Sequence, residues 1–326
     1  MTPLSVQTRL QTLLCFLLTS VLLVACGSLR NEVSPSLLSK EGERLVVNSY
    51  ISPQDTLLSV KVSRSKPVLG EQTDALPFNV ANATVSLTDG DRVVVLRYLD
   101  GKQWYQAKAG LLPILTGKTY TLTVSTPDGR KVTANATVPN PVPINRGLLD
   151  STVVPFTNRL QKVYSIRFDW QDPTPAANFY EYAAYFVWGT SSSVNVPKTD
   201  PSAVLRQLIF SGENRTGNLV TDARQEGGLL TSLSAEVGVV EVNANVPNSE
   251  AELKRLTLGK VLPNARVVMQ LLSTDELYFR YTDAVIRQRQ NRDNPFAEPV
   301  LIPTNIQGGL GCFAAYNRTE KIFLLR

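Results

Sequence analysis

The chain has 326 residues, a formal net charge of +5 and an apolar content of 43%. This length allows two domains of ordinary size with packed cores, and the charge is too mild to indicate nucleic acid as a partner. Histidine is absent, which excludes Ser-His-Asp and Cys-His catalytic pairs and removes the commonest zinc ligand. We therefore expect a non-enzymatic protein without a cofactor or a bound metal.

Residues 1–25 have the layout of a secretory signal, with a polar start, an apolar run from Leu13 to Val24 and a small-residue end. The stretch Leu23-Val24-Ala25-Cys26 resembles the lipobox of a bacterial lipoprotein. This pattern predicts cleavage before Cys26 and acylation of that residue, for example by palmitate. The alternatives are an ordinary signal peptide and a short anchor that stays uncut.

The polar residues 26–42 predict a flexible tether between the anchor and the folded part. The acyl chains would hold the protein at a bilayer surface, which we expect to be the outer membrane. The face of that membrane, towards the periplasm or the medium, stays open. Cys15 lies in the leader, so Cys312 is the one thiol that the mature domains would contain, without any internal disulfide.

Residues 43–140 predict an immunoglobulin-like β-sandwich of seven short strands separated by turns. Alternation of apolar and polar residues carries this prediction, as at Leu58, Val60 and Val62. Tyr120 fits a tyrosine corner, and a half-buried aromatic is the equal alternative. The proline-rich residues 141–160 are expected to connect this domain to the next one.

Residues 161–326 predict a second β-rich, sandwich-like domain with one helix. The strand from Phe179 to Trp188 is unusually aromatic, and Tyr180, Tyr182 and Trp188 fall on one of its faces. These three side chains are candidates for a platform that binds a sugar or a peptide. A sandwich core explains the same spacing and is the favoured interpretation.

A helix is predicted over about residues 274–290, where apolar residues recur at helical spacing. Ser273, with Glu276 three residues later, fits a capping box at its start. Arginines 287, 289 and 292 lie near its end. Basic residues at the negative end of a helix dipole are a more ordinary reason for them than an anion or lipid-phosphate site.

The most specific segment lies near the C-terminus. It contains Tyr278 and Tyr281, then Asn294-Pro295-Phe296-Ala297-Glu298-Pro299-Val300, and then the run from Asn305 to Phe313. Together with residues 43–51 and 117–124, this segment resembles the DUF4249 family of Bacteroidota lipoproteins. The resemblance implies two β-rich domains, an envelope location and an accessory role beside a TonB-dependent outer-membrane transporter. It carries over no catalytic residues.

Glycines 308, 309 and 311 do not form a phosphate-binding loop, because neither the G-x-G-x-x-G spacing nor a Lys-Ser/Thr pair is present. We interpret this segment as the structural closure of the second domain, with Asn305 hydrogen-bonded to the turn. Cys312, which has apolar neighbours, is expected to be a buried and inert thiol. Asp55-Thr56 and Asp150-Ser151 resemble an O-glycosylation sequence of Bacteroidota envelope proteins.

These observations favour a lipid-anchored accessory or ligand-capturing partner of an outer-membrane transporter. A structural or adhesive spacer of the envelope is the alternative. A carboxylate-dependent hydrolase is a third hypothesis, because the two catalytic carboxylates of such an enzyme need not be close in sequence.

Overall fold

The computed structural model describes residues 43–65, 78–156, 159–173, 176–189, 203–211, 218–222, 227–243, 249–255, 265–292, 294 and 296–324. The helices and strands that the structure describes all belong to one compact unit, Arg44–Ser65 with Pro77–Arg326. The leader, Cys26 and the expected tether lie outside the described residues.

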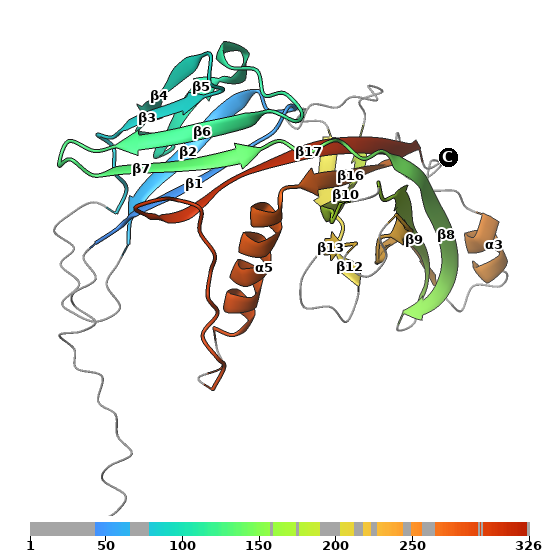
Figure 1. The fold of residues 1–326 in the computed structure, drawn as a ribbon. Helices are drawn as coiled ribbons and strands as arrows, with labels where there is room; N and C mark the ends of the chain where they lie inside the picture. Colours follow the sequence, from blue (N-terminus) through green and yellow to red (C-terminus); the bar gives the residue numbers. More distant parts are fainter. Residues whose placement is uncertain are drawn as a thin grey trace, which may run out of the picture. The chain divides into compact units, whose positions relative to one another are not determined.

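The fold is mainly β, as predicted, and Figure 1 shows its described elements. The strands are β1 Leu45–Ile51, β2 Leu57–Arg64, β3 Thr84–Thr88, β4 Val93–Leu99, β5 Trp104–Lys108, β6 Thr119–Ser125, β7 Lys131–Thr137, β8 Ile144–Phe156, β9 Arg159–Gln171, β10 Phe179–Gly189, β11 Ala203–Gln207, β12 Phe210–Ser211, β13 Leu219–Thr221, β14 Leu229–Thr231, β15 Ser234–Asn243, β16 Arg266–Thr274 and β17 Leu310–Leu324. The helices are η2 Ala109–Leu111, α3 Ser249–Arg255 and α5 Glu276–Gln290.

Strands β1 to β7 occur where the alternating pattern predicts them, and their inward residues enclose a first core. In β6, the apolar residues Tyr120, Leu122 and Val124 are buried, while the threonines between them point outward. β-branched threonines suit such a half-exposed strand. The immunoglobulin-like arrangement of these strands stays a prediction.

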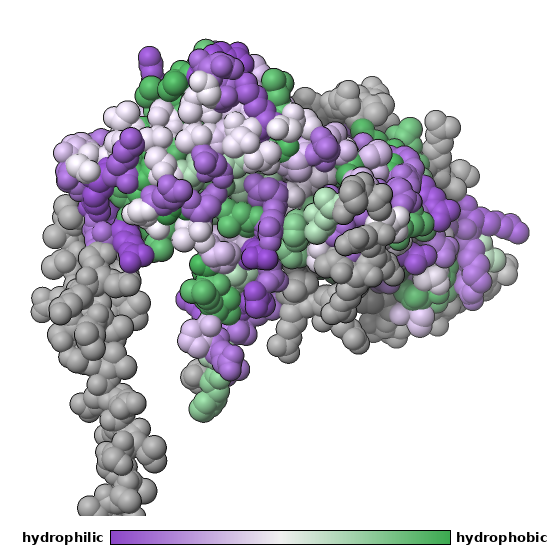
Figure 2. All heavy atoms as spheres, viewed as in Figure 1, coloured by the Kyte–Doolittle hydropathy of each residue, from purple (hydrophilic) through white to green (hydrophobic). Residues whose placement is uncertain are grey.

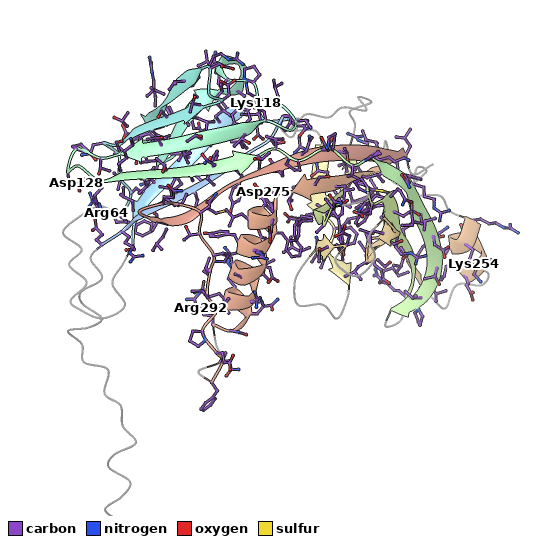
Figure 3. The ribbon with its side chains drawn as sticks, viewed as in Figure 1. Arg64, Lys118, Asp128, Lys254, Asp275 and Arg292 are labelled. Atoms are coloured by element: carbon purple, nitrogen blue, oxygen red, sulfur yellow. The ribbon has the colours of Figure 1, made fainter. Side chains whose placement is uncertain are left out.

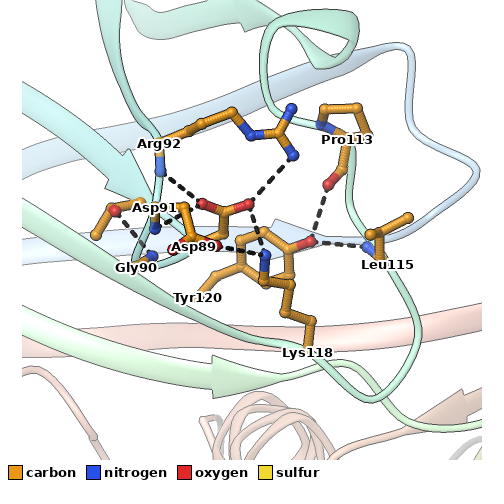
Figure 4. Close-up of polar contacts among 9 residues, drawn as sticks. Asp89, Gly90, Asp91, Arg92, Pro113, Leu115, Lys118 and Tyr120 are labelled. Atoms are coloured by element: carbon orange, nitrogen blue, oxygen red, sulfur yellow. Dashed lines mark hydrogen bonds and ion pairs between the residues drawn. The ribbon is translucent and has the colours of Figure 1, made fainter.

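Tyr120 is fully buried, so the half-buried alternative is wrong. Its hydroxyl donates to the carbonyl of Pro113 and accepts from the amide of Leu115, both at 2.8 Å (Figure 4). A phenol bound to backbone a few residues upstream is the defining contact of a tyrosine corner. Beside it, Asp89 accepts from Lys118 Nζ at 2.9 Å, and this bond is the main reason that the pKa of Asp89 lies below its ordinary value.

Residues 141–160, expected to be a connection, contain a long strand instead. β8 pairs antiparallel with β9 from Ile144↔Trp170 to Phe156↔Arg159. This strand was not predicted because prolines lie near its start, and proline, which lacks an amide donor, argues against a central strand. The division of the chain into two domains at this point stays a prediction.

One large sheet runs through most of the described strands, in the order β11-β10-β16-β17-β1-β2-β5-β4-β3-β6-β7, with β13 also paired to β10. β17 joins its two parts. The start of β17 pairs parallel with β1, from Val46↔Leu310 to Ile51↔Ala315. The rest pairs antiparallel with β16, from Thr274↔Tyr316 to Arg266↔Leu324.

The glycine-rich segment therefore closes against the first core, and the expectation that it closes the second domain is wrong. A Cβ at Gly311 would lie 2.1 Å from the carbonyl oxygen of Val47, and one at Gly309 would lie 2.7 Å from that of Leu45. Glycine is thus required where this segment meets β1. Asn305 holds the turn as expected, donating to Phe313 O at 2.7 Å and accepting from Phe313 N–H at 3.0 Å.

A second core lies between β10 and β16 of the large sheet and a smaller sheet of order β12-β15-β9-β14, to which β8 is added. Its centre is aromatic: Trp170, Phe168 and Tyr182 are buried, and the Phe168 and Tyr182 rings meet edge to face at 5.8 Å. Edge-to-face contacts of this kind stabilise cores beyond the area that they bury.

Helix α5 confirms the predicted helix but begins later, and its cap is not Ser273. Asp275 is the N-cap, and its carboxylate accepts from Tyr278 N–H at 2.7 Å. Ser273 lies in β16, where its hydroxyl is buried and has no hydrogen-bond partner among the described residues. Because β16 continues to Thr274, Ser273 has strand conformation and the helix cap falls at Asp275. Across the part of the chain that the structure describes, no helix has the length and apolar character to cross a membrane.

Candidate functional site

Several side chains with raised pKa values lie together where α5 covers the large sheet. In β1, Val47 and Ile51 face the first core, so Asn48 and Tyr50 face the opposite side. In β17, Phe313 and Ala315 likewise face the first core, which turns Cys312 and Tyr316 to the opposite side. Since β1 and β17 are paired in parallel, these four residues form one surface under the helix.

Helix α5 completes this surface from above. Tyr278 and Tyr281, three residues apart, lie on the same helix face. The ring of Tyr278 meets Tyr50 at 5.3 Å, nearly perpendicular, and Tyr316 at 5.9 Å. We call the four tyrosines together with Glu181 of β10 and Cys312 the tyrosine cluster; its members are Tyr50, Glu181, Tyr278, Tyr281, Cys312 and Tyr316.

Hydrogen bonds connect the cluster's phenols to two strands and to one turn. Tyr278 donates a short hydrogen bond to the carboxylate of Glu181, on β10. Tyr281 donates to Asn48 Oδ1 on β1 at 3.0 Å. Tyr316 donates to Asp55 Oδ1 at 3.3 Å, in the turn before β2. Tyr278, Tyr281 and Tyr316 are thus donors with fixed acceptors, and the first two of these bonds join α5 to the sheet.

Burial favours the neutral forms of the phenols and of the thiol in the cluster. Desolvation raises the pKa values of Tyr50, Tyr278 and Cys312 well above their ordinary values, and that of Tyr316 to about 12. Desolvation also raises the pKa of Glu181, against the lowering effect of the bond from Tyr278. A thiol with a raised pKa is a poor nucleophile.

The cluster can therefore bind by hydrogen bonds and ring contacts, and it holds no activated nucleophile. Tyr50 is 36% exposed and gives it a face to solvent. Within the described ranges, no group of three or more acidic or cysteine side chains is placed to hold a metal ion. Cys312 has the buried environment that the sequence indicates.

The three aromatic candidates on β10 do not form an open platform. Tyr180 and Tyr182 are buried in the second core, and Trp188 packs against that core from its edge. Tyr180 donates to Asp172 Oδ1 at 2.6 Å, and Tyr182 accepts from Leu233 N–H at 3.2 Å. The phenol groups thus satisfy buried polar partners, which favours the core interpretation.

A shallow cavity of about 450 Å³ lies on the smaller sheet, across β8, β9 and the start of β15. Its lining residues are Leu148, Leu149, Asp150, Ser165, Arg167 and Ser234. Asp150 belongs to one of the two O-glycosylation sequences, and Ser151 beside it is exposed, as is Thr56 in the other. Cys26, the expected lipidation site, lies outside the described residues.

The sequence analysis named Tyr278, Tyr281 and Cys312, but it gave no site role to Tyr50, Glu181 or Tyr316. Alternation in β1 places Tyr50 on the face opposite to that of Val47, and this was the signal that the sequence offered. It could not show what covers that face, because α5 lies more than 200 residues later, as the 233-residue separation of Tyr281 and Asn48 shows.

The comparison with known families confirms the resemblance that the C-terminal segment indicated. The family model DUF4249, described as a domain of unknown function, matches residues 30–322. The chain belongs to the DUF4249 family. The matched region includes every described strand of the fold except the last residues of β17, so the DUF4249 match covers both cores and the tyrosine cluster. Among curated proteins, none matches the chain at a significant level.

Proposed function

We propose that this DUF4249 protein is a lipid-anchored protein of the outer membrane that acts as a non-enzymatic accessory, or ligand-capturing partner, of a TonB-dependent transporter. The observation that carries the proposal is the order of parts along the chain. A signal-like segment ends at Cys26, a polar stretch follows, and a compact β-rich unit begins at Arg44. This order is typical of an acylated protein whose folded part works outside the cytoplasm.

The chemistry of the tyrosine cluster supports binding over catalysis. Its phenols and thiol are held neutral by burial, while general acid–base catalysis needs groups with pKa values near the working pH. Asp275, beside the cluster, is the one neighbour with a pKa near 6, and its carboxylate is occupied by backbone donors.

A second feature supports a protein partner. The outer face of β4 and β5 carries several exposed apolar side chains around the Arg97–Gln106 pair: Val93, Val95 and Leu99 are 66%, 58% and 42% exposed, and Trp104 is 37% exposed. Leu99 and Trp104 are paired neighbours across the two strands. Clustered exposed apolar residues are typical of interaction surfaces. A transporter is the partner that the proposal assigns to this face.

The anchor is tested by metabolic labelling with an alkyne-bearing palmitate analogue, followed by membrane fractionation. The full chain is expected to take up the label and to sediment with the outer membrane. The Cys26→Ala variant is expected to lose the label, and Cys312→Ala serves as the matched control that keeps it. Equal labelling of the wild type and the Cys26→Ala variant would contradict the proposal.

A further inference from the structure

The most exposed apolar side chains of the described part lie in one short segment after α5. We call this segment the hook, and it is described at residues 291–292, 294 and 296–304. Phe296 is 94% exposed and Leu301 is 91% exposed. Figure 2 shows hydrophobic residues at the tip of this segment and along its return beside the helix. Such exposure of large apolar side chains is costly in water unless another surface covers them.

The hook projects from the sheet on a rigid support. Figure 3 shows α5 running from Asp275, at the sheet, to Arg292 at its far end. A helix of 15 residues is about 22 Å long at 1.5 Å per residue. The hook therefore carries Phe296 roughly this far from the sheet surface that α5 covers.

Hydrogen bonds hold the hook at its tip and at its base. The side chain of Asn294 accepts from Phe296 N–H at 3.0 Å, and the carbonyl of Asn294 accepts from Ala297 N–H at 3.1 Å. At the base, Asn305 donates to the carbonyls of Asn135, at 2.9 Å, and of Phe313, at 2.7 Å. These bonds form a turn that carries Phe296, and the polar residues Arg292 and Asn294 come before it in the sequence.

The base of the hook lies beside the point where the chain enters the fold. Leu310 pairs with Val46 of β1, and the backbone of Leu45 touches Gly309. Residues 27–43 span at most about 60 Å even when fully extended. A lipid on Cys26 would therefore keep Arg44, where the compact unit begins, within about this distance of the bilayer.

We propose that the hook is a second, shallow membrane contact, in which Phe296 and Leu301 insert among the headgroups and upper acyl chains of the bilayer that holds the lipid anchor. This inference rests on the proposed function for the position of the anchor. Two separate, nearly fully exposed apolar side chains on a protruding turn suit a bilayer, because a protein partner would require a broader and flatter contact. Arg289 and Arg292 precede the two inserted side chains in the sequence, and Glu298 lies between those two side chains. The inserted side chains are apolar, so we expect the contact to depend little on headgroup charge.

The test uses the chain from Gly27 onward, which lacks the leader and Cys26 but keeps the whole compact unit. Co-sedimentation with large unilamellar vesicles at millimolar lipid is measured for phosphatidylethanolamine–phosphatidylcholine vesicles and for vesicles that also contain phosphatidylglycerol. We expect binding to both compositions. The Phe296→Ser/Leu301→Ser variant is expected to lower the partition coefficient at least about tenfold. The matched control Val93→Ser/Val95→Ser, which removes exposed apolar area from β4, is expected to leave it unchanged.

A second variant reports depth without weakening the contact. Tryptophan at position 296, in the Phe296→Trp variant, is expected to shift its fluorescence to the blue with vesicles and to be quenched by lipids brominated high on the acyl chain. The inference would be overturned if the wild type bound neither vesicle composition. It would also be overturned if the double-serine variant bound as well as the wild type. Loss of transporter co-purification without loss of vesicle binding in that variant would also overturn it, since the hook would then contact protein. The vesicle and fluorescence measurements use a chain that cannot be acylated, so they do not depend on labelling at Cys26, whereas transporter co-purification uses the full-length variant.

Discussion

Asp275 and Ala315 are joined by two hydrogen bonds that run in opposite directions. The amide of Asp275 donates to the carbonyl of Ala315 at 3.0 Å, and the amide of Ala315 donates to the Asp275 carboxylate at 2.7 Å. The same carboxylate caps α5 through Tyr278 N–H. One side chain therefore fixes the start of the helix to the part of β17 that lies between the two cores.

Replacing Asp275 by alanine is expected to lower the free energy of unfolding by about 2–4 kcal/mol. Loss of an N-cap costs about 0.5–2 kcal/mol, and the buried amide of Ala315 would also lose its partner. Urea denaturation measures the change. Ser273→Ala is the control, because its buried hydroxyl has no partner and its removal should change stability by less than about 0.5 kcal/mol. A larger loss in Ser273→Ala than in Asp275→Ala would restore Ser273 as the cap.

Asp275 also predicts a pH dependence. Burial raises the pKa of its carboxyl from 3.8 to about 6, against the lowering effect of its backbone donors. Between these two values the folded state holds a proton that the unfolded state has released, so the stability contribution falls as the pH rises. The difference in unfolding free energy between wild type and Asp275→Asn is expected to fall by roughly 2–3 kcal/mol from pH 4 to 6, and to be constant above about pH 7. A difference that rises over this range would contradict the prediction.

Gly311→Ala is expected to lower the free energy of unfolding by more than about 3 kcal/mol. The added methyl group would overlap the backbone of Val47, and the backbone of Gly311 has a φ of +110° that disfavours other residues. Gly90→Ala is the control for the dihedral angle alone, since Gly90 has a φ of +97° with open space around it. It should cost about 1–2 kcal/mol. Equal losses in the two variants, measured by urea denaturation, would argue against close contact between β17 and β1.

Tyr120→Phe is expected to cost about 1–3 kcal/mol, because the amide of Leu115 and the carbonyl of Pro113 both lose their bond to the buried hydroxyl. Tyr185→Phe is the matched control. Tyr185 is half-buried and its hydroxyl has no hydrogen bond among the described residues, so its removal should be nearly neutral. Thermal unfolding distinguishes the two, and equal melting temperatures would contradict the assignment of Tyr120 as a corner.

Local pattern predicted much of the fold, and pairing between distant segments did not follow from it. Alternation located β1 to β7 and β9, since a half-buried strand must alternate whatever its partner. The first half of β17 does not alternate, because Phe313 faces the first core while Cys312 is covered from the side of α5. Its parallel partner is β1, more than 250 residues earlier in the chain, and no short-range signal specifies that register.

The candidate site was predictable to the same extent. The residues of α5 and Cys312 stood out in the C-terminal segment, whereas Tyr50 and Glu181 come from strands that this helix covers only in the folded chain. The aromatic residues of β10 looked like a binding surface because composition alone does not tell which side of a strand a second sheet covers. Tyr180 and Tyr182 lie on the covered side.

Mild crosslinking of the tagged, full-length protein in native outer membranes, followed by affinity purification and mass spectrometry, tests the proposed function most directly. The account predicts that one TonB-dependent transporter is recovered with the wild type. It predicts much lower recovery with a Val95→Asp/Leu99→Asp variant of the exposed face, and unchanged recovery with the matched control Leu229→Asp on the smaller sheet. Recovery of the protein without any transporter would contradict the account and would favour a spacer of the cell envelope.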